Sequence, residues 1–334
     1  MRTAGRSNEE VKVFYPPQPG ESIAERQRGH REVESDAQDI TFRTLGAEPS
    51  ITVGLLPLWT SAVSRLPLAL RISFWDKESM TVKALIGTSG FGVGRAKYVE
   101  LFSSVEVQHT FYQPPKIATL ERWREESPAD FEFVLKAWQL ITHDSKSPTY
   151  RRLKRQLSEK EKQEAGYFRP TAIVKEAWEV TLACAQALKA RAIIFQCPAS
   201  FKPTKENIAN LEKFFVMIRK DKSVEQRFNF YWEPRGDWDD TVVREICESL
   251  NLSHALDPFV TKSVTPHSLY LRLHGRGGWR YEYDEGELRE LAQMLPKRLA
   301  KGSPPYVFFN NVRMTQDALR FRAIVSSKYA VGPL

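Results

Sequence analysis

The sequence has few cysteines and no long apolar run, and both absences restrict what this protein can be. Only Cys184, Cys197 and Cys247 occur in 334 residues, and neither their odd number nor their spacing fits a disulfide framework or a metal site. No uninterrupted apolar run reaches the roughly 18–20 residues of a membrane span, and the N-terminus lacks the charged-then-apolar pattern of a secretory signal. We therefore expect an intracellular, cytoplasmic protein with no membrane partner.

Several common catalytic signatures are also missing. The glycine-rich stretch 275–281 does not have the spacing of dinucleotide- or phosphate-binding loops, and no His-x-x-x-His pair occurs. No motif therefore requires a cofactor, and the local spacing predicts no metal site.

Positive charge is concentrated in one part of the chain. The formal net charge is +8, yet residues 1–79 carry 10 of the 49 basic and 11 of the 41 acidic residues. The remaining part carries the whole excess, which fits an anionic substrate or a polyanion such as nucleic acid. A soluble protein that is merely basic fits the same numbers.

Residues 1–79 read differently from the rest and are predicted to form a poorly structured extension. They contain a proline-rich stretch at 16–20 and a charged run at 25–39, and prolines interrupt their apolar segment at 51–75. Met80 stands directly before the first regular pattern. Two interpretations remain: translation begins at Met80 and the gene model is too long, or the segment is a targeting or regulatory extension.

Residues 80–330 alternate between short apolar runs and helical patterns. Eight buried runs, each followed by a helix except the sixth, are typical of a single (β/α)₈ TIM barrel, an α/β fold of about 250 residues. The predicted strands are 84–87, 104–107, 131–137, 192–196, 228–233, 253–257, 268–274 and 306–310, and the predicted helices 95–102, 117–126, 172–189, 204–220, 239–250, 285–300 and 315–327.

This segment resembles the YecE-like proteins, the domain-of-unknown-function family 72. The shared motifs occur in order between residues 84 and 325: Gly87-Thr88-Ser89-Gly90-Phe91, Val105-Glu106-Val107, Thr110-Phe111-Tyr112, Trp123, Phe131-Glu132-Phe133, Lys136, Ile141-Thr142-His143, Gln196-Cys197-Pro198, Phe201, Glu233-Pro234-Arg235, Trp238, Tyr270-Leu271-Arg272-Leu273-His274-Gly275 and Tyr306-Val307-Phe308-Phe309-Asn310-Asn311. The resemblance implies a TIM barrel similar in shape to endonuclease IV and xylose isomerase, and nucleic-acid binding has been proposed for the family from that shape. The chain departs from the family at Gln108-His109, where Asn-Ser is common.

Polar side chains at the ends of the predicted strands form the candidate site, since a TIM barrel keeps its chemistry there. Glu233 ends an aromatic strand and is a candidate general base or metal ligand, or else a buried ion-pair partner. His274 is a candidate acid or a hydrogen-bonded structural histidine. The predicted substrate-binding residues are Lys136, Arg235, Arg272, Gln196, Asn310, Thr88 and Tyr112. Alternation along the seventh strand puts Tyr270, Arg272 and His274 on one face, taken as the lumen.

Two loops supply further basic groups. The segment 143–170 mixes basic and aromatic side chains, which suits a phosphate backbone and stacked bases, or alternatively a solvated helix face. The loop 275–281 carries Arg276 and Arg280, and we expect it to fold over a bound phosphate.

The sequence therefore predicts an enzyme that acts on a phosphorylated or other anionic substrate at the C-terminal mouth of the barrel. One alternative is a non-enzymatic nucleic-acid-binding barrel. A second is a metal-dependent nuclease or sugar isomerase related to the endonuclease IV and xylose isomerase barrels.

Overall fold

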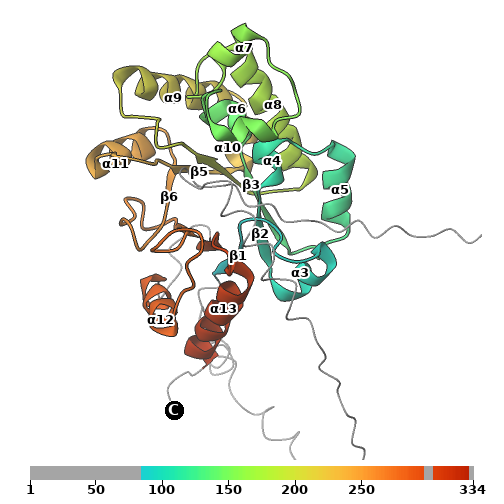
Figure 1. Ribbon diagram of the computed structural model, residues 1–334, viewed down its shortest axis with the longest axis vertical. Helices are drawn as coiled ribbons and strands as arrows, with labels where there is room; N and C mark the ends of the chain where they lie inside the picture. Colours follow the sequence, from blue (N-terminus) through green and yellow to red (C-terminus); the bar gives the residue numbers. More distant parts are fainter. Residues whose placement is uncertain (1–83, 297–303, 331–334) are drawn as a thin grey trace, which may run out of the picture. The chain divides into compact units, whose positions relative to one another are not determined.

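The computed structural model describes residues 84–296 and 304–330, which belong to one compact unit (Figure 1). The extension expected over residues 1–79 lies outside the described residues. No helix within the described part of the chain is long and apolar enough to span a membrane.

Eight parallel strands form the predicted barrel. They lie in the spatial order β1-β8-β7-β6-β5-β4-β3-β2, and every neighbouring pair is parallel. Parallel strands buried on both faces read as continuous apolar runs, which is why the sequence located all eight. Their bounds are β1 Leu85–Thr88, β2 Ser104–Val107, β3 Glu132–Lys136, β4 Ala192–Gln196, β5 Asn229–Glu233, β6 Ser253–Leu256, β7 Tyr270–Leu273 and β8 Tyr306–Phe309.

Helices surround the strands on the outside (Figure 1). The predicted helices are present, and the connection between β6 and β7 has none, as expected. The loops also contain short helices. The sequence did not predict them, because a helix of one or two turns has too few residues to show a period. The described helices are α3 Arg95–Leu101, α4 His109–Tyr112, α5 Ile117–Glu125, α6 Gln139–Thr142, α7 Glu159–Glu164, α8 Ala172–Ala187, α9 Lys205–Ile218, α10 Lys222–Arg227, α11 Asp240–Ser249, α12 Glu285–Met294 and α13 Met314–Ala330, with a 3₁₀ helix, η2, at Pro148–Arg152.

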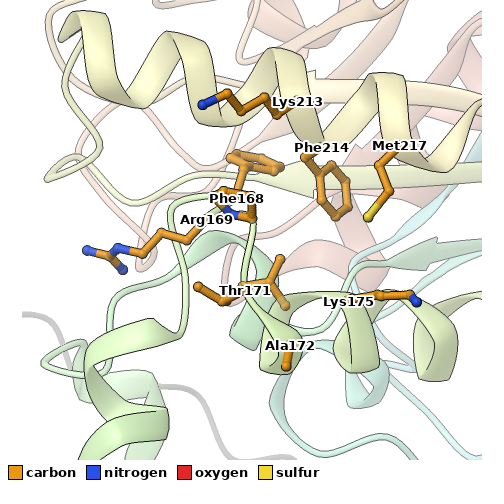
Figure 2. Close-up of a pocket in the computed structure, with 10 residues that line it drawn as sticks. Phe168, Arg169, Thr171, Ala172, Lys175, Lys213, Phe214 and Met217 are labelled. Carbon is orange, nitrogen blue, oxygen red and sulfur yellow. The ribbon is translucent and has the colours of Figure 1, made fainter.

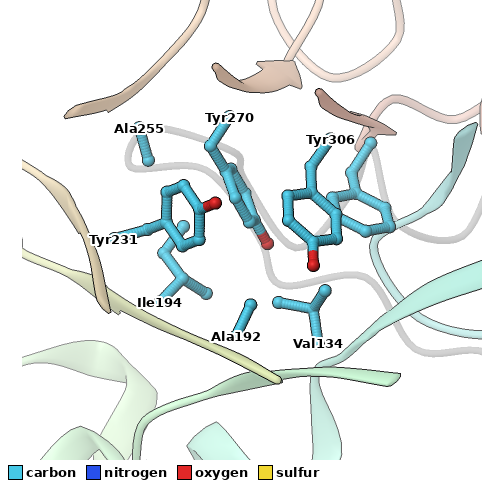
Figure 3. Close-up of a cluster of buried hydrophobic side chains, with 8 residues drawn as sticks. Val134, Ala192, Ile194, Tyr231, Ala255, Tyr270 and Tyr306 are labelled. Carbon is cyan, nitrogen blue, oxygen red and sulfur yellow. The ribbon is translucent and has the colours of Figure 1, made fainter. Parts of the chain in front are cut away.

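A cluster that includes three tyrosines fills the barrel interior on the N-terminal side of the strand ends. Figure 3 shows Tyr231, Tyr270 and Tyr306 side by side, and the ring centroids of Tyr270 lie 4.7 Å from Tyr231 and 5.4 Å from Tyr306. The rest of the cluster is Val134, Ala192, Ile194, Ala255 and Phe308. Alternation along each strand then points the polar residues two positions later toward the C-terminal mouth.

The barrel closes between β1 and β2 by one bridge, Ser89 to Glu106, instead of a ladder. The two strands approach so closely that a Cβ at Gly87 would collide with the carbonyl oxygen of Ser104. The Tyr98 hydroxyl of α3 secures this seam, since it accepts from Thr88 N at 2.9 Å and donates to Ser104 O at 3.1 Å.

Replacing Tyr98 with phenylalanine should therefore lower the free energy of unfolding by about 1–3 kcal/mol, because Thr88 N loses its buried acceptor. Urea denaturation of the variant and the wild type would measure the change. An unchanged free energy of unfolding would show that the hydroxyl does not secure the seam.

Candidate functional site

Arg272 occupies the centre of the mouth and is fully buried. One edge of its guanidinium binds Glu106 through two hydrogen bonds, Nε to Oε2 at 2.9 Å and Nη2 to Oε1 at 2.7 Å. Glu106 Oε2 also accepts from the Tyr270 hydroxyl at 2.6 Å, and Oε1 accepts from Ser89 at 3.1 Å and from Gln108. Burial alone would raise the pKa of Glu106, but the charge and hydrogen bonds of Arg272 outweigh it and lower that pKa.

Glu233 is the second carboxylate held by the same guanidinium. Its Oε2 accepts from Arg272 Nη1 at 2.5 Å, and its Oε1 accepts from Arg235 Nε at 2.9 Å and Gln196 Nε2 at 3.1 Å. Burial opposes ionisation, yet the two arginines hold the pKa of Glu233 well below its ordinary value. The carboxylate is therefore ionised, and both of its oxygens are engaged.

His274 lies beside Glu233 as a neutral imidazole. Arg235 Nη2 is 2.7 Å from Nε2, and a guanidinium can only donate, so Nε2 accepts and the ring proton sits on Nδ1. The Asn310 amide lies 3.0 Å from Nδ1, and we assign its oxygen to that contact. Burial lowers the pKa of His274, and the charges of Arg235 and Arg272 add to this effect against the opposing contact with Glu233.

Among the residues that the structure describes, Lys136 differs from Arg235 and Arg272 at the mouth because it has no carboxylate partner. Among the described residues no carboxylate lies within ion-pair distance of its Nζ, because Arg272 already binds Glu106 and Glu233. The side chain is 5% exposed and its Nζ lies 3.8 Å from the centroid of the Phe111 ring. Burial, with the charge of Arg272, lowers the pKa of Lys136 to about 7.

The His143 ring packs against the same phenylalanine, with the ring centroids of His143 and Phe111 4.8 Å apart. Burial, with the charge of Lys136, lowers its pKa to about 3, so the ring is neutral at neutral pH. Its Nδ1 is 2.8 Å from Thr142 Oγ1, and its carbonyl accepts from the Tyr150 hydroxyl at 2.8 Å.

The structure brings most of the predicted site residues together. The contacts above join six of the strand-end residues directly, and Lys136 lies in their electrostatic field; the set is Lys136, Gln196, Glu233, Arg235, Arg272, His274 and Asn310. They come from β3, β4 and β5 and from β7, β8 or the residues that directly follow them. The convergence follows from the parallel register, which places all strand ends at one rim.

Thr88 and Tyr112 lie differently from the other predicted substrate-binding residues. Thr88 points away from the lumen, and its hydroxyl contacts Gly90 O at 2.6 Å and the Tyr98 hydroxyl at 2.9 Å. Tyr112 is half-buried at the rim, where the guanidinium carbon of Arg152 lies 3.6 Å from its ring centroid. The lumen-facing residue of the first strand end is Ser89, as alternation from Leu85 requires, since the half-buried Leu85 packs against the cluster inside the barrel.

The loops at the rim hold their basic side chains in different ways. Within 143–170, three basic residues form ion pairs with glutamates: Arg155 with Glu161 and Glu176, Lys160 with Glu164, and Lys162 with Glu159. Arg151, Arg152 and Lys154 are exposed and have no carboxylate within ion-pair distance in the described part of the chain.

We expected the glycine-rich loop 275–281 to fold Arg276 over the mouth, but the structure places this side chain against α12 instead. The guanidinium binds Glu287 at 3.3 Å and Glu290 at 3.4 Å, both on α12, and lies 4.3 Å from the centroid of the Phe259 ring. The acidic start of α12, with its Asp284 capping box, competes successfully for this cation.

The donor set does not fit the metal-dependent alternative. In residues 84–296 and 304–330, no group of three or more His, Cys, Asp or Glu side chains is arranged to hold a metal ion. The carboxylates nearest the centre, Glu106 and Glu233, direct their oxygens at Arg272. The three cysteines are buried and free.

A hollow of about 420 Å³ lies outside the barrel wall between α8 and α9. Figure 2 shows Phe214 and Met217 of α9 facing Thr171 and Ala172 at the start of α8, with Phe168 between them. No strand residue lines it, so it is separate from the cluster at the mouth.

Sequence reasoning missed two contributors to the site. Gln108 donates to Glu106, and Phe111 forms the wall beside Lys136. Both lie in the short turn after β2, whose one-turn helix α4 gives no periodic signal. The departure from the family at Gln108-His109 was the available signal: Gln108 faces Glu106, while His109 packs on Trp123 with centroids 5.6 Å apart.

The fold and the motifs are shared with proteins of one family. A family model described as "Protein of unknown function DUF72" matches residues 94–331. The UPF0759 protein YunF of Bacillus subtilis (strain 168) is 23% identical over 239 residues, which cover 64% of this chain and 79% of that protein.

Solved structures of the same family share the fold. A crystal structure of a DUF72 family protein from Enterococcus faecalis V583 superposes with a TM-score of 0.57 at 19% identity, covering 73% of this chain and 96% of the other. A DUF72 family protein from Thermotoga maritima MSB8 gives a TM-score of 0.52 at 19% identity, covering 73% and 100%.

Proposed function

This chain belongs to the DUF72 family of proteins of unknown function, and we propose that its barrel mouth binds a small phosphorylated or carboxylated compound as an enzyme substrate. The observation that carries this proposal is the imbalance between hydrogen-bond donors and acceptors at the C-terminal ends of the strands.

The acceptors at the mouth are already used. Glu106 and Glu233 bind Arg272 and its neighbours with all four oxygens, and Asp257 accepts from the backbone N–H groups of Phe259 at 3.0 Å and His274 at 2.9 Å. A cation would find no free carboxylate there.

The donors are not used up. Lys136 Nζ has no protein acceptor, and Arg235 uses Nε and Nη2 but leaves Nη1 without one among the described residues. The Arg235 side chain is 40% exposed, so an anion reaches it from solvent. Unmet cationic donors favour a ligand that supplies oxygen acceptors and negative charge.

This arrangement gives Glu233 and His274 different roles from a general base and a general acid. An ionised carboxylate with a strongly lowered pKa is a weak base, and a neutral imidazole whose Nε2 already accepts cannot protonate a leaving group there. We assign both to positioning: Glu233 binds Nε and His274 binds Nη2 of Arg235, so that Nη1 faces the ligand.

Titration calorimetry with inorganic phosphate and sulfate would test the proposal. The wild type should bind phosphate, and Arg235→Gln should weaken binding by roughly tenfold to a hundredfold, since a charge-assisted hydrogen bond is worth about 1.5–3 kcal/mol. Arg289→Gln, an exposed arginine on α12, is the matched control and should leave binding unchanged.

Two outcomes would overturn the proposal. One is the absence of any anion binding. The other is tight Mg²⁺ or Zn²⁺ binding that Glu233→Gln abolishes, which would favour metal-dependent chemistry.

Nucleic-acid binding is the second candidate, favoured by exposed Arg151, Arg152 and Lys154 at the rim and by the stacking of Arg152 on Tyr112. It predicts affinity for single-stranded DNA that falls steeply with salt and is lost in Arg151→Gln/Arg152→Gln, with little effect of Arg235→Gln. Binding of phosphate alone should tolerate that double replacement.

A further inference from the structure

We propose that Lys136 is a nucleophilic amine that forms an imine with an aldehyde or ketone carrying a phosphate or carboxylate. The inference rests on the proposed function, because the anionic group is the part of the substrate that Arg235 would hold. It adds the chemical class of the substrate and the group that reacts with it.

Lys136 differs from every other lysine in the described part of the chain, all of which are exposed. A buried lysine is ordinarily ion-paired or extends its ammonium to water. Lys136 has no carboxylate within ion-pair distance among the described residues; its side chain is 5% exposed, and its Nζ lies 3.8 Å from the centroid of the Phe111 ring. Burial without a carboxylate partner disfavours the charged amine, and the face of the Phe111 ring offsets part of that cost.

The charged side chains around Lys136 act on its pKa in opposite directions. Glu106 of β2 and Glu233 of β5 attract a proton to Lys136, while Arg272 of β7 and Arg235 repel it. Arg272 holds both carboxylates at hydrogen-bond distance, and burial of the amine together with repulsion from Arg272 outweighs the attraction of the carboxylates for its proton. His143, after α6, adds no charge at neutral pH. Burial and the nearby arginines lower the pKa of Lys136 to about 7, which makes the neutral amine accessible near neutral pH.

A neutral amine in the electrostatic field of Arg272 and Arg235 has a defined reaction with a carbonyl compound. The nitrogen lone pair attacks the carbonyl carbon, and the carbonyl oxygen receives a proton from the amine to give a carbinolamine. The C–O bond then breaks, and the hydroxyl leaves as water with the second proton of the amine, which leaves a C=N bond to Nζ. The step is a condensation that consumes the carbonyl compound and releases one water, and it needs no oxidant or reductant.

Reductive trapping would test this on the full chain. Incubation with glyoxylate and cyanoborohydride fixes an imine as a carboxymethyl amine, which peptide mass spectrometry locates. At pH 7 a lysine of ordinary pKa is about a thousandfold poorer in neutral amine than Lys136. We expect Lys136 to be labelled at least about tenfold faster than exposed Lys205, a margin that allows for its restricted access.

The pH dependence and competition sharpen the test. Labelling of Lys136 should rise through pH 7 and then level off, while labelling of Lys205 keeps rising in more alkaline buffer. Phosphate should slow labelling of Lys136 and leave Lys205 unaffected. Lys136→Met should remove the fast-labelled peptide, whereas Lys205→Met should retain it.

The two proposals fail separately. If phosphate binds through Arg235 but Lys136 is labelled no faster than Lys205, the imine inference is overturned and the anion site stands. If neither phosphate nor sulfate binds, the proposed function is overturned together with the inference that rests on it.

Discussion

Replacing Arg272 with methionine should lower the free energy of unfolding by roughly 3–5 kcal/mol, because it leaves the buried Glu106 without its ion-pair partner and Glu233 with Arg235 alone. The guanidinium is fully buried and makes three short contacts with Glu106 and Glu233. Water cannot take its place at a fully enclosed position, and methionine supplies no donor. Guanidinium chloride denaturation at pH 7 would measure the loss.

The loss should depend on pH in a defined direction. In the wild type the pKa values of Glu106 and Glu233 are lowered, so their stabilisation is complete above the ordinary glutamate pKa of 4.5 and disappears as the pH falls through the lowered values. Without Arg272, burial raises both pKa values. The variant then gains stability by protonation as the pH falls from 7 toward 5, and its deficit relative to the wild type shrinks.

Two further variants separate this account from a simple loss of packing. Adding Glu106→Gln to Arg272→Met should recover part of the stability, since one unpaired buried charge is removed. Arg289→Met breaks an exposed pair with Glu285 and should change the free energy of unfolding by at most about 0.5 kcal/mol. A deficit independent of pH and of Glu106→Gln would contradict the proposed role of Arg272.

The barrel could be predicted from the sequence because its signals are local. The run at 192–195 is apolar, as a strand buried on both faces requires, and the helix that follows begins with Thr204 as its N-cap. The residues at the strand ends then follow from the parallel topology without any knowledge of their contacts. Thr88 is the exception, since one position of register turns a side chain from the lumen to the helices.

The protonation states of the site could not be read from the sequence. Glu233 reads as a buried acid, but its basicity depends on which cations touch it, and Arg272 reaches it from β7, 39 residues away. His274 reads as an acid until the contact from Arg235 fixes its tautomer. Lys136 reads as an anion contact, and only the pairing of both carboxylates with Arg272 reveals that it has no partner. These properties depend on side-chain distances between strands.

Gly166→Ala should also be strongly destabilising and should disturb the site from outside the barrel. Gly166 has φ +80°, and a Cβ there would collide with the carbonyl of His143 and lie 2.7 Å from Asp144 N. The left-handed backbone costs an alanine roughly 1–2 kcal/mol, and relieving the collision costs roughly 1–3 kcal/mol more. We expect the free energy of unfolding to fall by about 2–5 kcal/mol.

The segment around Gly166 explains why that collision reaches the mouth. Tyr167 and Phe168 continue the left-handed stretch with φ of 54° each, and N–H groups of 166 and 168 bind the carbonyls of Leu140 and Ile141 at 2.8 Å. Phe168 is fully buried, so the turn cannot swing outward to make room. The turn at 166–168 therefore fixes the position of the segment that carries His143. The His143 ring packs against Phe111, and Phe111 in turn lies beside Lys136.

Gly278→Ala isolates the two contributions, since Gly278 has φ +101° but no atom within contact distance of an added Cβ. This control should lose only the backbone term of roughly 1–2 kcal/mol and leave phosphate affinity and Lys136 labelling near their wild-type values. Gly166→Ala should lose more and also change the labelling rate of Lys136, because the wall beside that amine moves. Equal losses in both variants, with labelling unchanged, would mean that the turn yields and that His143 is positioned by the barrel alone.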